Sequence, residues 1–158
     1  MPRWTGTWLS GLAAAGVQTG EPGAYKGSRL GLPEGGSGSV AGFGARLGGF
    51  VLDVITGALI GGLANLFVAE PTSGQRTLFA NTGFALEVLV LVALTGQSIG
   101  MRLVGIRVLS LRAPASVPGF LPAAIRTALL ALLVPALLMD RDGRGLHDKA
   151  ARTVVVRA

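Results

Sequence analysis

An apolar run of 23 residues over positions 47–69, interrupted by the single formal charge of Asp53, constrains this chain more than any other feature. A helix of that length reaches about 34 Å, enough to cross a hydrocarbon core of about 30 Å. A buried helix of a soluble protein is the competing interpretation. However, only 14% of the 158 residues are charged, against roughly 25% in soluble domains, so little polar material could cover several such runs. The sequence therefore predicts an integral membrane protein.

A second apolar run covers residues 78–95 and is interrupted by Asn81 and Glu87. The intervening residues 70–77 form a short polar loop, and two helices joined by so short a loop pack antiparallel. We therefore predict two transmembrane helices arranged as a hairpin.

A third apolar run covers residues 118–139 and contains Arg126 and Pro135, of which the proline would kink or end a helix. The positive-inside rule places the first tail, with four basic residues, and the connection 96–117, with three, in the cytoplasm. Three full crossings would put five basic residues of the last tail outside. We favour a third helix that is partly inserted, and keep a spanning helix as the alternative.

Two short segments rich in branched residues, 104–111 and 153–157, are typical of strands and could pair on the cytoplasmic side. Residues 1–42 are rich in Gly, Ser and Pro and are predicted to be a flexible tail. The fold class expected is thus an all-α membrane protein with one small β pairing. Its membrane domain would cover residues 43–158.

Three ionisable residues interrupt the apolar runs, namely Asp53, Glu87 and Arg126. Charged groups at membrane depth usually face the protein interior and pair with one another. Counted along the helices, all three could lie in one polar layer in the cytoplasmic half. This layer is either a site for a cation or proton, with the carboxylates as ligands, or a buried ion pair that fixes helix register.

Other sequence features point to packing rather than chemistry. Gly57 and Gly61 form a G-x-x-x-G motif, which allows another helix to approach closely. The chain has no cysteine, and its single histidine, His147, has no further metal ligands nearby in the sequence. We therefore expect no metal, no cofactor and no enzymatic activity. Because the basic residues flank apolar runs, we expect a lipid bilayer rather than nucleic acid as the partner.

Three segments resemble the RDD family of membrane proteins: GARLGGFVLD at 44–53, GQSIGMRLVGIRV at 96–108 and GLHDKAARTVVV at 145–156. The family signature of one arginine and two aspartates would correspond to Arg46, Asp53 and Asp148. Reasoning from the residues alone gives other roles, with Arg46 reaching to lipid phosphates and Asp148 capping a helix start. Met101 departs from the family, whose members often have lysine there, and Glu87 is outside its pattern.

The resemblance implies a multi-pass protein of the bacterial plasma membrane with a cytoplasmic N-terminus. It also implies transport of ions or small solutes, which has been suggested for the family. We therefore expect a transporter, or a transporter subunit, for a cation or small solute. Because two or three helices do not easily enclose a pathway, we expect a homo-oligomer or an assembly with another membrane protein. The alternative is a non-transporting accessory protein that docks a partner at the cytoplasmic face.

Overall fold

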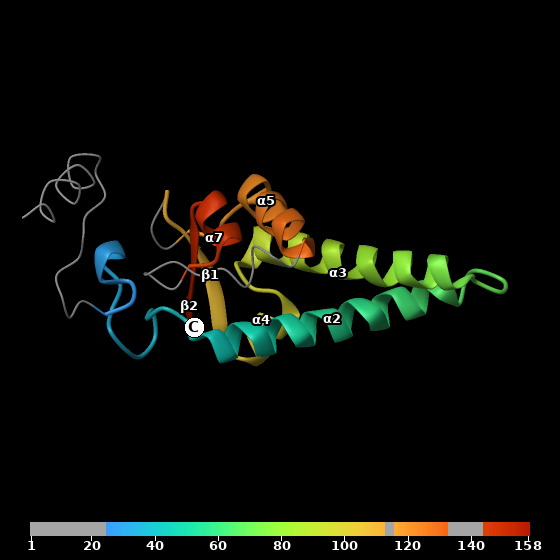
Figure 1. The fold of residues 1–158 in the computed structure, drawn as a ribbon, viewed down its shortest axis with the longest axis horizontal. Coiled ribbons are helices and arrows are strands. Elements are labelled where there is room, and N and C mark those ends of the chain that lie inside the picture. The colour runs from blue at the N-terminus through green and yellow to red at the C-terminus, as the bar shows by residue number, and fades with distance from the viewer. Residues whose placement is uncertain (1–24, 113–115, 133–143) are drawn as a thin grey trace, which may run out of the picture.

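Two long antiparallel helices, α2 (Phe43–Asn65) and α3 (Ser73–Thr95), project as a hairpin from a smaller body at one end (Figure 1). The fold is given by a computed structural model that describes residues 25–112, 116–132 and 144–158. The body contains the remaining elements: η1 (Ser28–Leu30), α4 (Ile99–Leu103), β1 (Ile106–Ser110), α5 (Phe120–Ala131), α7 (Leu146–Ala150) and β2 (Thr153–Arg157). The predicted hairpin is therefore present, with α2 beginning four residues earlier than the apolar run.

A stripe of small residues lets the two long helices approach closely. The buried residues of α2 are Gly49, Asp53, Gly57 and Gly61, which recur every fourth position and so lie along one face. A Cβ atom added at Gly57 would stand 2.5 Å from the Cβ atom of Phe84 in α3. Only glycine fits this distance, so the G-x-x-x-G motif packs the hairpin together within one chain.

The start of α3 is fixed by a capping box. The Thr72 side chain accepts a hydrogen bond from the Gln75 backbone N–H at 3.3 Å, and the Gln75 side chain accepts one from the Thr72 N–H at 2.9 Å. These bonds satisfy two backbone donors that a helix start leaves unpaired. At the other end, Gly96 adopts a left-handed conformation with φ 74° and ends the helix.

Both long helices are long and apolar enough to cross a membrane, judged by length and composition. Within the most apolar window of each helix, only 22% and 28% of the residues are buried inside the molecule. A core helix of a soluble protein would be mostly buried, so this exposure argues against the soluble alternative. Large apolar side chains are the most exposed near the loop of the hairpin, where Leu66 is 78% and Phe67 89% exposed.

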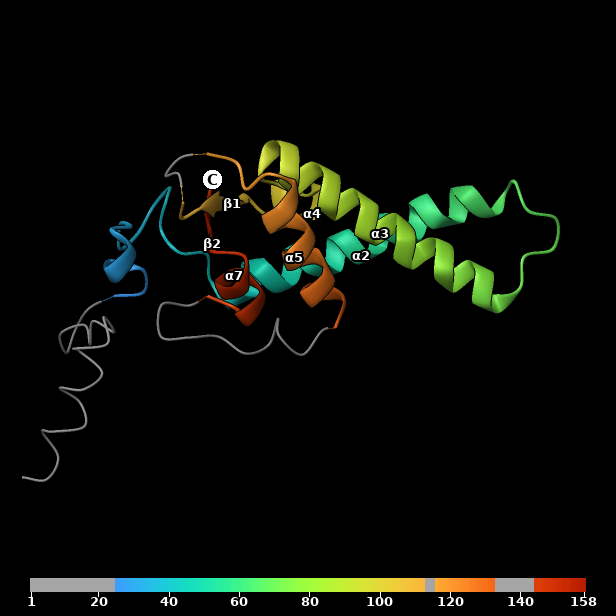
Figure 2. The same cartoon turned by 90° about the horizontal axis from the view of Figure 1, so that it is seen from above.

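The third apolar run is helical over Phe120–Ala131, which forms α5. At 12 residues, or about 18 Å, α5 is too short to cross a bilayer by itself. It packs beside α3 at the end of the hairpin that carries the body (Figure 2). The later part of the predicted segment, 133–139, lies outside the described residues.

The predicted pairing of the two strands is confirmed. β1 and β2 are antiparallel, with Val108 opposite Val155 at the centre of the register. Both outer edges of this sheet form backbone hydrogen bonds with neighbouring segments. Along β1, the N–H of Val108 donates to the Gly96 carbonyl at 2.7 Å, and along β2 the Val155 carbonyl accepts from the N–H of Ala41 at 3.0 Å.

The hydrophobic core lies where the sheet meets the helices. It joins residues from most elements of the body, and its buried members are Ala41, Val88, Val92, Ala93, Met101, Ile106, Val108, Ala123 and Val155. Residues 38–41 were predicted to belong to the flexible tail, but Gly38, Ser39 and Ala41 hydrogen-bond to β2. At least this part of 1–42 therefore packs with the folded region, whereas 1–24 lie outside the described residues.

Candidate functional site

Asp53 lies on the small-residue face of α2 and is 1% exposed. Its Oδ2 atom accepts a hydrogen bond from the Ser98 hydroxyl at 2.6 Å, and its Oδ1 atom accepts one from the Gly100 N–H at 2.6 Å. The Ser98 oxygen in turn accepts from the Met101 N–H at 3.2 Å and caps α4. Both carboxylate oxygens of Asp53 are thus engaged in holding the start of α4.

Glu87 of α3 reaches the same helix start from the opposite side. Its Oε1 atom accepts a hydrogen bond from the Ile99 N–H at 2.7 Å, and the residue is 8% exposed. Its Oε2 atom is buried and accepts no hydrogen bond from the residues that the structure describes. Two carboxylates from the two long helices therefore satisfy the first backbone donors of α4, where the helix dipole favours negative charge.

The docking of α4 depends on a second close approach between backbones. A Cβ atom at Gly100 would overlap the carbonyl oxygen of Gly49 and stand 2.7 Å from the Oδ1 atom of Asp53. Any larger residue at this position would push α4 away from α2. The absence of a side chain at Gly100 therefore permits the hydrogen bond to Asp53.

Asp148 of α7 is the centre of a second cluster of charges. It is fully buried, and its carboxylate forms ion pairs with Arg46 of α2, at 2.9 Å, and with Arg126 of α5. Its side chain also lies 3.5 Å from the Thr153 hydroxyl at the start of β2. One carboxylate thus joins four elements at the body end of the hairpin.

Arg46 does not extend to lipid, which corrects the expectation drawn from the residues alone. Besides its ion pair with Asp148, it donates hydrogen bonds to the carbonyl oxygens of Ala41, at 3.1 Å, and Val155, at 3.2 Å. Likewise Asp148 is not the cap of α7, because Gly145 holds that position and Asp148 lies in the first turn. The arginine and the last aspartate of the signature bind each other, and Asp53 binds elsewhere.

The predicted layer of Asp53, Glu87 and Arg126 is brought together only in part. The two carboxylates converge on α4 and repel each other, and Arg126 attracts Asp53 over a longer distance. Within the described ranges, however, Arg126 makes its ion pair with Asp148 and with neither of them. The predicted ion pair of Arg126 with Asp53 or Glu87 is therefore wrong, because the partner of Arg126 is Asp148.

Sequence reasoning missed α4 and the residues that hold it, Ser98 and Gly100. A signal for them exists, because Gly96 followed by Ser98 is typical of one helix ending and another being capped. The five residues of α4 are too few to produce an apolar period, so periodicity does not distinguish this helix from the connection 96–117.

The charges of this region are not paired one to one. Among the described residues, the guanidinium groups of Arg46 and Arg126 both pair with the carboxylate of Asp148, whereas the carboxylates of Asp53 and Glu87 form no ion pair. No group of three or more metal-ligating side chains occurs in the part of the chain that the structure describes. The two carboxylates of Asp53 and Glu87 repel each other and can attract a positive charge.

The sequence model of the RDD family matches residues 40–152, well over half of the chain. Comparisons with curated proteins and with solved structures gave no match. The matched region contains Arg46, Asp53 and Asp148 together with both long helices. The resemblance seen in the three sequence segments is thus confirmed, and the chain belongs to the RDD family, a family of membrane proteins.

Proposed function

We propose that this chain is a multi-pass protein of the bacterial plasma membrane that transports a cation or a small solute, alone or as a subunit of a transporter. The observation that carries the proposal is the buried Oε2 atom of Glu87, which accepts no hydrogen bond from the described residues. A carboxylate oxygen that is removed from water and lacks a hydrogen-bond donor is stabilised when it binds a proton or a cation.

The carboxylates of Asp53 and Glu87, which form no ion pair with a described residue, support a positively charged ligand. Asp53 repels the ionised form of Glu87, so adding a proton or a cation at Glu87 relieves this repulsion. The sequence predicts both carboxylates as ligands of the ion. Because both oxygens of Asp53 are hydrogen-bonded, Glu87 is the better candidate for the group that binds it, and Asp53 is a positioning residue.

For the topology we propose that α2 and α3 cross the bilayer, that the body lies at the cytoplasmic end, and that α5 is partly inserted. The pairing of β1 with β2 supports this, because both ends of the segment between them lie at one end of the hairpin. The outward face of α5 is apolar, with Leu121 67% and Ile125 38% exposed, as expected for a helix in contact with acyl chains.

We further propose that the transporting unit is a homo-oligomer or an assembly with another membrane protein, since two crossing helices do not enclose a pathway. The faces of Gly57 and Gly61 pack against α3 within the chain. An interface between chains would therefore use the outward face of α2, where Leu59 and Leu63 are exposed. Cross-linking of single cysteines at these two positions in vesicles tests this part of the proposal.

The function is tested by flux measurements on the purified chain in proteoliposomes. Glu87→Gln keeps the shape of the side chain and an oxygen that can accept from Ile99, but it cannot bind a proton or balance a cation. We expect cation-driven flux to be lost while helical content and assembly are unchanged. The control is Glu70→Gln, at the exposed loop of the hairpin, which should transport as the parent does. Normal flux in Glu87→Gln would remove Glu87 from the mechanism.

The alternative function is a non-transporting accessory protein that docks a partner at the cytoplasmic face. It predicts that the purified chain has no flux of its own and that a membrane pull-down recovers one protein at fixed stoichiometry. Flux from the purified chain without such a partner counts against it. The two measurements together separate the alternatives.

A further inference from the structure

The body end of the molecule carries an excess of exposed positive charge. Arg102 is exposed on α4, and six further exposed basic residues lie on the body: Lys26, Arg107, Arg112, Lys149, Arg152 and Arg157. None of the seven forms an ion pair with another described residue. Among the described residues of this end, Glu34 is the one exposed acid. Such a surface attracts an anionic partner.

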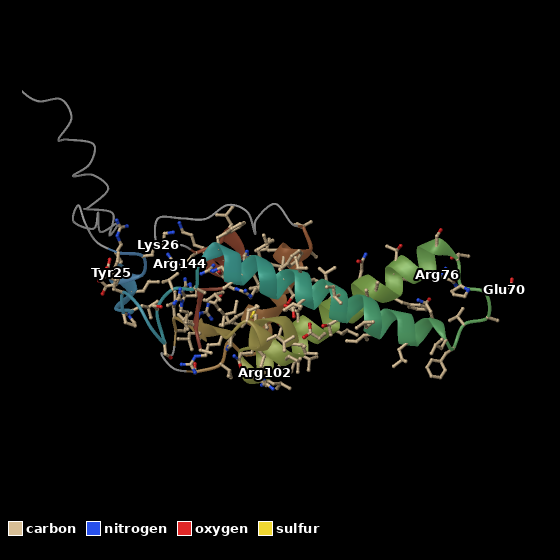
Figure 3. The ribbon with its side chains drawn as sticks, turned by 90° about the horizontal axis from the view of Figure 1, so that it is seen from below. Tyr25, Lys26, Glu70, Arg76, Arg102 and Arg144 are labelled. Carbon is tan, nitrogen blue, oxygen red and sulfur yellow. The ribbon has the colours of Figure 1, made fainter. Side chains whose placement is uncertain are left out.

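Arg102 lies on α4, which packs directly against α2. Its neighbour Gly100 packs against Gly49, which is six residues, or about 9 Å, from the start of α2 at Phe43. The Arg102 side chain points away from the helices (Figure 3). If α2 crosses the bilayer, this level is just inside the cytoplasmic boundary of the hydrocarbon core. A long arginine side chain can reach the lipid phosphates from there.

The residues beside Arg102 on α4 are apolar and exposed. Ile99 is 38% and Leu103 69% exposed, so the outward face of α4 combines one cation with two apolar side chains. A partner that fits it must offer apolar chains and a negative charge next to each other, as a phospholipid does. The phosphate backbone of a nucleic acid supplies only the charge.

We propose that Arg102 binds the phosphate of an anionic phospholipid in the leaflet that faces the body, and that the six other basic residues favour anionic over zwitterionic lipid. The inference rests on the topology proposed above, but not on transport. One basic residue near such a surface contributes enough attraction to change lipid affinity roughly fivefold. Arginine suits the role because its planar guanidinium donates two hydrogen bonds to a phosphate.

Native mass spectrometry of the full chain in detergent tests this inference. The chain is mixed with equal amounts of phosphatidylglycerol and phosphatidylcholine, and each bound lipid is counted. We expect the parent chain to prefer phosphatidylglycerol, and Arg102→Gln to bind it about fivefold more weakly with phosphatidylcholine unchanged. Arg102→Lys should retain most of the binding because it keeps the charge. Arg76→Gln, at the opposite end of the hairpin, is the matched control and should bind as the parent does.

Equal affinities of the parent chain and Arg102→Gln for phosphatidylglycerol would overturn the inference. It would also be overturned if excess inorganic phosphate displaced the lipid, because the ligand would then be free phosphate. A co-purified acidic protein that is lost in Arg102→Gln while lipid binding is kept would overturn it in favour of a protein partner. Because no arm measures flux, a chain that transports nothing can still support this inference, and loss of lipid preference does not touch the proposal for Glu87.

Discussion

Removing the charge of Asp148 is expected to destabilise the body strongly. The carboxylate is fully buried and pairs with Arg126, whose side chain is 3% exposed, and with Arg46, whose side chain is 11% exposed. Asp148→Asn removes the direct ion-pair partner of the buried Arg126, and breaking a buried pair in this way costs about 3–5 kcal/mol. Arg46 loses less, because it keeps its hydrogen bonds to two backbone carbonyl oxygens.

The free energy of unfolding, measured by circular dichroism in mixed micelles with increasing denaturing detergent, should therefore fall by about 3 kcal/mol. The matched variant replaces both partners, with Asp148→Leu and Arg126→Met. Because two buried charges leave together, it should be more stable than Asp148→Asn alone. A loss below about 0.5 kcal/mol in Asp148→Asn, the size of an ordinary surface substitution, would refute the reasoning. So would a double variant as unstable as the single one.

The remaining predictions concern close contacts between backbones. Gly57→Ala should lower the free energy of unfolding by about 1–3 kcal/mol, because its Cβ atom would stand 2.5 Å from Phe84. The matched control is Gly62→Ala, since a Cβ atom there would have nothing within 4 Å. Equal stabilities of the two variants would contradict the packing of Gly57 against α3. Gly100→Ala should detach α4 from Gly49 and increase hydrogen exchange at the amides of 99–101, and unchanged protection there would show that α4 tolerates a side chain.

The long helices and the strand pairing could be predicted because their signals are local and periodic. The runs 47–69 and 78–95 are apolar over more residues than a short core helix needs, and Val154, Val155 and Val156 are typical of a strand. The ends were less accurate. α2 begins at Phe43 because Gly44, Ala45 and Arg46 continue the helix although they do not continue the apolar run.

The pairing of charges could not be predicted because it depends on segments far apart in the chain. Arg46 and Asp148 are 102 positions apart, and nothing in the spacing of either residue indicates the other. Depth along each helix predicts one level for Asp53 and Glu87, and both residues bind the start of α4. Depth does not indicate that a returning connection supplies their hydrogen-bond donors. Depth along the helices therefore does not identify Asp148 as the ion-pair partner of Arg126.

The covered edges of the small sheet affect how neighbouring copies of the chain can contact one another in a membrane. Two-stranded sheets with open edges are templates on which strands of neighbouring molecules can add. Here Gly96 occupies one edge and Ser39 and Ala41 occupy the other. Copies of this chain that lie side by side at high local density therefore cannot pair through these strands. Contacts between them would be made by side chains.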